Sequence, residues 1–206
     1  MAILAKKIAK NVVTKPGKAL WCKVNNTFDS QKLDNGTVRE FSVANIQFNE
    51  QDMADMKAQI KAWFEEAKNS PEFEGKKWLG TDDSMCIFED EAHGKGEYIR
   101  SRTNAFYINK DTGEKERHWI PVFDKYGRPL GHDVAIGNGS EIQLRFDVSA
   151  YWASKTVNGV NLYLTGVVVK DLVEFGGDDA TGFTFEAAPD AAEVLNNAAE
   201  EEEIPV

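Results

Sequence analysis

Apolar and polar residues alternate along several stretches of the chain. The segment 20–24 alternates in this way, and so does 141–148, where every second residue is a large apolar one. Successive side chains of a β-strand point to opposite faces, so each stretch predicts a strand with one buried face. Further strands are predicted at 38–48, 97–108, 117–123 and 160–175, with Gly166 as a bend or bulge in the last.

One segment has a helical period instead. Between residues 51 and 68 the apolar side chains recur at spacings of three and four, and Pro71 follows shortly after. The pattern predicts one helix inserted between early and late strands. Five or more strands with one inserted helix predict a mainly β fold, a five-stranded Greek-key barrel of the OB type, with a two-sheet sandwich as the alternative.

Charge is segregated to the two ends of the chain. Of 34 acidic residues nine lie in 178–206, which contains no Lys or Arg, so residues 1–177 hold 25 acids and 24 bases. Residues 1–23 contain six lysines and no acid. These patterns predict a folded domain over 1–177 with a basic N-terminal arm over 1–17, followed by a flexible acidic tail over 178–206.

Several classes of protein are excluded by what the sequence lacks. No apolar run reaches the roughly 20 residues of a membrane helix, and the N-terminus has no secretory pattern, so a cytosolic protein is predicted. Cys22 and Cys86 stand far apart and have no neighbouring cysteine, which predicts two reduced, buried thiols and no zinc site. No nucleotide-binding or hydrolase motif occurs, so no cofactor and no enzymatic activity are predicted.

One acidic run leaves a metal-dependent alternative open. Glu89, Asp90 and Glu91 could bind a divalent cation and support a nuclease. Magnesium sites usually draw their carboxylates from separate elements, so a solvated acidic loop is the preferred interpretation. The histidines His93, His118 and His132 are scattered among charged and turn residues and form no recognisable catalytic set.

Aromatic rings and cations share the faces of the predicted strands. In the segment 97–108, Tyr98, Arg100, Arg102 and Phe106 fall on one face. Bases stack on rings and phosphates bind cations, so this pattern is typical of a surface for single-stranded nucleic acid. The predicted binding residues are Trp21, Lys23, Tyr98, Arg100, Arg102, Phe106, Arg117, Trp119, Tyr151, Trp152 and Lys155. In the alternative, the rings lie in the core and the arginines extend past them to solvent.

The acidic tail can be connected to that surface. A tethered polyanion stays near a cationic groove at millimolar effective concentration, so the tail is predicted to compete with DNA. Once displaced, it would be free to dock on basic patches of partner proteins. Glu200, Glu201, Glu202 and Glu203 are the predicted tail residues for both roles. A tail that serves only solubility is the alternative.

Several segments resemble one family. The strand YIRSRTNAFYI, the stretch IGNGSEIQLRFDVSAYW and the exit NLYLTGVVVKDLVEFGGDD are similar to the phage-encoded single-stranded DNA-binding proteins of the T-odd podovirus replication type. The resemblance implies an OB-fold with an acidic tail that coats and protects single-stranded DNA during phage replication, recombination and repair. It implies that Tyr151 stacks on a base. This chain ends Ile-Pro-Val, where the family ends in an aromatic residue.

The same resemblance implies partners and a location. The tail would contact a phage polymerase, helicase-primase and recombination proteins, and the protein would form a homodimer in the cytoplasm of the infected bacterial host. The alternative function is a structural or assembly protein of a phage particle, built on a β-sandwich.

Overall fold

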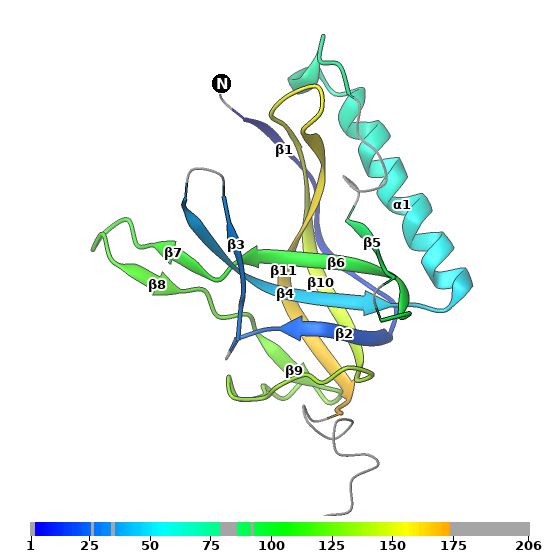
Figure 1. Cartoon of the computed structure of the whole chain (residues 1–206), viewed down its shortest axis with the longest axis vertical. Coiled ribbons are helices and arrows are strands. Elements are labelled where there is room, and N and C mark those ends of the chain that lie inside the picture. The colour runs from blue at the N-terminus through cyan, green and yellow to red at the C-terminus, as the bar shows by residue number, and fades with distance from the viewer. Residues whose placement is uncertain (1–2, 26, 34–35, 79–85, 92, 174–206) are drawn as a thin grey trace, which may run out of the picture. The chain divides into compact units, whose positions relative to one another are not determined.

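Strands β10 (Glu141–Trp152) and β11 (Asn158–Asp171) form the centre of the computed structural model, which describes residues 3–25, 27–33, 36–78, 86–91 and 93–173 (Figure 1). They pair antiparallel along their whole length. Alternate side chains of β10, from Ile142 to Val148, are fully buried, as the alternation predicts. The register shifts between Arg145 and Phe146, opposite Gly166, which confirms a bulge in β11 at the predicted glycine.

The remaining elements surround this pair. They are β1 (Leu4–Val13), β2 (Gly17–Lys23), β3 (Asp29–Lys32), β4 (Val38–Gln47), α1 (Glu50–Lys68), the 3-10 turn η1 (Pro71–Phe73), β5 (Ile87–Asp90), β6 (Gly96–Asn104), β7 (Phe106–Ile108), β8 (Lys115–Arg117) and β9 (Val122–Asp124). A nine-stranded sheet of described residues has the order β5-β6-β4-β2-β10-β11-β9, with β1 on β10 and β3 on β4. The strands pair antiparallel except for β9 and β11. Strands β7 and β8 form a separate hairpin.

The sheet curls so that β6 lies against β11, although three strands separate them in the order. Ser101 of β6, fully buried, donates a hydrogen bond from its hydroxyl to the carbonyl of Leu162 in β11, at 3.0 Å. Figure 1 shows β6 and β4 crossing β10 and β11. The core fills the space between these strands, and the crease between β6 and β11 stays open to solvent on its outer side.

The predicted helix is confirmed as α1. The Asn49 side chain accepts a hydrogen bond from the backbone N–H of Asp52 at 2.9 Å, so it caps the first turn. The buried face carries the apolar side chains that the period placed there, among them Ile60, Trp63 and Phe64. The Trp63 ring contacts Phe146 edge-on with centroids 6.3 Å apart, which fixes the helix to the central strand.

The N-terminal arm and the strand 97–108 differ from the prediction. Much of the N-terminal stretch assigned to a basic arm is strand β1, paired antiparallel with β10 from Leu4 opposite Trp152 to Val13 opposite Arg145. The predicted strand 97–108 is divided at Ala105, whose N–H donates to Glu40 and whose carbonyl accepts from His118. The chain therefore leaves the main sheet there and enters the separate hairpin.

The other sequence predictions concern cysteines, membranes and the tail. Cys22 and Cys86 are free and half-buried, and burial raises the pKa of both thiols to about 11. No helix within the described ranges has the length and apolar character needed to cross a bilayer. The predicted acidic tail, 178–206, lies outside the described residues.

Candidate nucleic-acid interface

Two adjoining hollows of about 210 Å³ each lie along the crease between β6 and β11. Phe88, Arg100, Arg102, Tyr151 and Asn161 line the first hollow, with Cys86 beside them. Gln31, Arg39, Phe41, Arg102, Asn104, Asn161 and Tyr163 line the second hollow. Because Arg102 and Asn161 line both hollows, the two form one continuous path over the sheet. Strands β3, β4, β5, β6, β10 and β11 all contribute to it.

Two guanidinium groups stand over aromatic rings in this path. Arg100 lies 4.4 Å from the centre of the Phe88 ring, and its Nε donates to the Asn45 side chain at 3.2 Å. Arg102 lies 4.7 Å from the centre of the Phe41 ring. These contacts fix both side chains in place, and neither guanidinium is paired with a carboxylate of the described residues.

Cations line the path, and among the described residues no acid does. No acidic side chain lines either hollow, and Arg39, Arg100 and Arg102 form no ion pair within the described part of the chain. Several cations elsewhere are paired: Lys6 with Glu72, Lys15 with Asp52 and Asp55, Lys57 with Glu97, Lys115 with Glu40, and Arg128 with Asp124. The crease therefore concentrates positive charge that is available to an anionic ligand.

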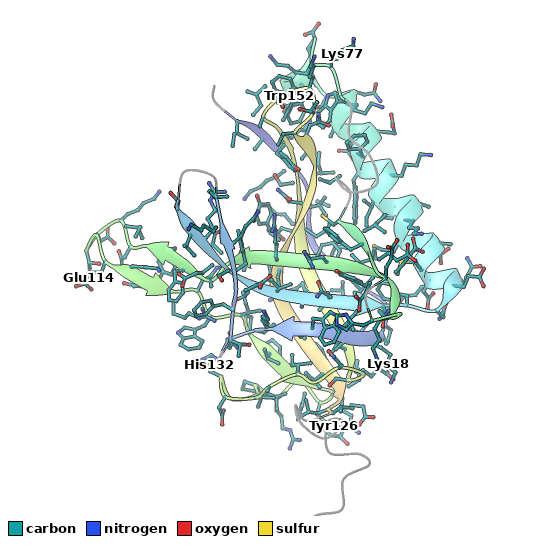
Figure 2. The ribbon with its side chains drawn as sticks, in the orientation of Figure 1. Lys18, Lys77, Glu114, Tyr126, His132 and Trp152 are labelled. Atoms are coloured by element: carbon teal, nitrogen blue, oxygen red, sulfur yellow. The ribbon has the colours of Figure 1, made fainter. Side chains whose placement is uncertain are left out.

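Tyr151 lies at the end of β10 and faces the first hollow together with both arginines. Burial raises the pKa of its hydroxyl, and the ring presents an uncharged surface for stacking. Trp152 points the other way, because neighbouring strand residues face opposite sides. Its ring N–H donates to the Lys77 carbonyl at 3.1 Å, and Figure 2 shows the two residues together.

The structure corrects the prediction for Tyr98. Its side chain is only 7% exposed, so the prediction of an exposed ring there is wrong. Strand β5 pairs with this end of β6, and its Phe88 ring stacks on Tyr98 with centroids 5.8 Å apart. The Tyr98 hydroxyl instead accepts a hydrogen bond from Arg100 at 3.1 Å. Phe88 supplies the ring that lines the first hollow.

A second cluster of rings surrounds Arg117. Its guanidinium lies within about 5–6 Å of the Phe28, Phe106 and Trp119 ring centres and donates to the carbonyls of Asn25 and Thr27. Burial lowers the pKa of Arg117, and this side chain supports the base of the hairpin. The predicted strand 117–123 is interrupted between β8 and β9, and this break leaves Trp119 with 47% of its surface exposed.

The remaining predicted residues lie apart from the crease hollows. Trp21 is partly exposed on β2, with its ring 5.1 Å from that of His93, and Lys23 forms an ion pair with Asp29 at 3.1 Å. Lys155 is exposed in the turn after β10. Of the predicted set, the structure brings Arg100, Arg102 and Tyr151 together in the first hollow.

Sequence reasoning missed the residues that complete the path. Phe88, Arg39, Phe41, Asn161 and Tyr163 all line it. A signal for the last two was present, because the polar or amphipathic side chains at 161 and 163 alternate with apolar neighbours in β11.

The acidic run does not form a metal site in the described residues. No group of three or more His, Cys, Asp and Glu side chains there is arranged to hold a metal ion. Asp90 instead pairs with His93, with Oδ1 2.9 Å from Nδ1, and this contact lowers the pKa of the Asp90 carboxyl.

The chain is similar to known single-stranded DNA-binding proteins of bacteriophages. A family model described as the single-stranded DNA-binding protein of bacteriophage T7 matches residues 22–172. No curated protein sequence matches the chain. Among solved structures, gp2.5, a single-stranded DNA-binding protein encoded by bacteriophage T7, is 20% identical with a TM-score of 0.60. The match covers 89% of this chain and 99% of that one.

A second phage protein has a similar fold. The single-stranded DNA-binding protein of bacteriophage Enc34 is 13% identical with a TM-score of 0.54, over 86% of this chain and 94% of that one. The same Enc34 protein in complex with single-stranded DNA gives a TM-score of 0.55, over 84% and 96% of the two chains, at 13% identity.

Proposed function

The chain belongs to the family of the bacteriophage T7 single-stranded DNA-binding protein, and from that membership we propose how it binds DNA. It is a phage single-stranded DNA-binding protein, and the family is one of non-enzymatic proteins. One strand of DNA runs along the crease between β6 and β11. Bases stack on Tyr151 and Phe88, and phosphates bind Arg100 and Arg102. Stacking tolerates every base, so the complex coats DNA of any sequence.

One observation supports this path above all others. The two hollows share Arg102, contain three arginines without a carboxylate partner in the described residues, and are edged by aromatic rings. A polyanion gains most where cations have not already been neutralised. The second cluster, around Arg117, supports an extension of the path past Asn104 toward the partly exposed rings of Phe106 and Trp119.

A titration tests this function. We expect a fluorescently labelled oligo-dT to bind with an affinity that falls in salt, with a slope of about −2 for three phosphate contacts on a single strand. Duplex DNA of equal length should bind far more weakly, because its bases cannot reach the rings. Titration with an RNA strand of equal length shows whether the protein binds DNA or RNA more tightly. Equal binding of duplex and single strand, or no binding at low salt, would contradict the proposal.

We also propose that five of the strands form an OB barrel. Strands β2, β4, β6, β11 and β10 follow the order of a five-stranded Greek-key OB barrel in which β6 and β11 close the circle. The contact between Ser101 and Leu162 supports that closure. On this view the DNA-binding domain spans residues 1–177, and 178–206 is a separate acidic tail.

We assign the tail two roles. Its nine acids, including Glu200, Glu201, Glu202 and Glu203, would compete with DNA for the arginines of the crease. Once displaced, the tail would dock on the phage polymerase, helicase-primase or recombination proteins. We place the protein as a homodimer in the cytoplasm of the infected host. The alternative of a particle-assembly protein gains no support from the family match.

Deleting residues 178–206 tests the competitor role. The truncated protein should bind oligo-dT about tenfold more tightly at low salt, because a tethered competitor at millimolar effective concentration has been removed. The difference should shrink as salt screens the tail. Anisotropy titrations of both proteins across a salt series measure it, and an unchanged or weaker affinity would remove this role from the tail.

A further inference from the structure

The second hollow is lined by three amide side chains that make no hydrogen bond to another described residue. Among the Asn and Gln residues that the structure describes, the side chains without a hydrogen bond to another described residue are those of Asn11, Gln31, Gln59, Asn104 and Asn161. Gln31, Asn104 and Asn161 all line the second hollow, although they come from β3, β6 and β11. The fold brings three strands that are distant in sequence together there, and their amide groups make no hydrogen bond to another described residue.

Amides in other parts of the fold are engaged in fixed hydrogen bonds. Asn25 bonds both the N–H and the carbonyl of Ile120, and Asn45 accepts from Arg100. Gln143 donates to the Thr14 carbonyl at 2.8 Å. The amides of the second hollow make no such bond to another described residue, so their donors and acceptors are available to a ligand.

The chemistry of the hollow fits the edge of a nucleobase. A carboxamide offers one acceptor and two donors side by side, which is the arrangement needed to bind a base bidentately. The ring of Tyr163, 42% exposed, and the ring of Phe41 supply surfaces for the face of the same base. Arg39 adds a cation without an ion pair among the described residues, suited to the attached phosphate.

We infer that the second hollow binds one nucleotide by the hydrogen-bonding edge of its base, through Gln31, Asn104 and Asn161. This inference rests on the proposed function, since it concerns one position on the same path. The first hollow binds bases by their faces and accepts any of them. The second adds contacts that depend on the donors and acceptors of the base.

An oligonucleotide blocked at the base edge tests the inference. Replacing thymidine by N3-methylthymidine throughout oligo-dT removes the N3–H donor and obstructs the edge while keeping the charge and the ring. Wild-type protein should bind the methylated strand about tenfold more weakly, the loss of one bidentate contact. The variant Gln31→Leu/Asn104→Leu/Asn161→Leu should bind both strands alike, within about twofold, at the affinity that the wild type has for the methylated one.

Gln59→Leu is the matched control, since its amide also has no partner among the described residues but lies on the exposed side of α1. It should retain the wild-type preference. Equal binding of the two strands by wild-type protein would overturn the inference while leaving the proposed function intact, and it needs no variant to fold. A triple variant that is folded by circular dichroism but still discriminates would also overturn it. Failure to bind either strand would instead contradict the proposed function.

Discussion

Replacing Arg100 and Arg102 together by alanine should weaken binding to oligo-dT about 100-fold at low salt. Each guanidinium contributes a charge-assisted hydrogen bond worth roughly 1.5 kcal/mol or more, and 1.4 kcal/mol corresponds to a factor of ten. Neither guanidinium is paired with a carboxylate in the described residues, so each substitution removes a full positive charge from the phosphate-binding surface. The salt slope should also fall by about 1.4, or 0.7 for each lost contact.

A charge-matched control separates the crease from net charge. Lys61 and Lys77 are exposed and lie outside both hollows, so Lys61→Ala/Lys77→Ala removes the same charge elsewhere. We expect this variant to bind within about threefold of wild type, since distant exposed charges are largely screened. Equal losses in the two double variants would mean that net charge, and not the crease, determines affinity.

Replacing Phe146 by alanine should destabilise the protein by about 4 kcal/mol. The ring is fully buried in β10, lies opposite Val12 and Leu164 in the two flanking strands, and contacts Trp63 of the helix. Removing it opens a cavity where three elements meet, and Phe→Ala changes of this kind cost about 3–5 kcal/mol. In a chain of this size the midpoint of thermal unfolding should fall by about 12 °C.

Tyr126→Ala is the control for the loss of stability expected in Phe146→Ala. Its ring is 72% exposed in the turn after β9, so the change should cost less than about 0.5 kcal/mol. Calorimetry or a denaturant titration measures both variants. If Phe146→Ala melted within about 2 °C of wild type, the packing of β10 between β1, β11 and the helix would be contradicted.

Local periodicity was enough to predict the helix and the strands β2, β4, β10 and β11. The alternation in β2 and β10 and the helical period of α1 each arise within a few residues, so they can be read without knowing the partner strands. Strand β1 could not be found in this way. Its lysines and small residues resemble a solvated segment, and its order comes from backbone pairing with β10, which only the tertiary structure supplies.

The candidate site was predicted in part for a similar reason. Alternation correctly placed Arg100 and Arg102 on one face, but it could not reveal that β5 covers Tyr98 at the start of that face. Nor could it show that β3 and β11 approach β6, because contacts between distant strands are absent from local patterns. The curled sheet therefore had to be known before Gln31 and Asn161 could be assigned to the path.

The proposed path of DNA is tested most directly by mapping which aromatic rings contact the bases. Oligo-dT containing 5-iododeoxyuridine, photolysed in complex with the full chain and analysed by mass spectrometry, reports the aromatic side chains that lie against bases. We expect cross-links at the rings that line the two hollows, Phe41, Phe88, Tyr151 and Tyr163. Cross-links confined to Tyr126 and Trp152, outside both hollows, would contradict the claim that single-stranded DNA follows the crease between β6 and β11.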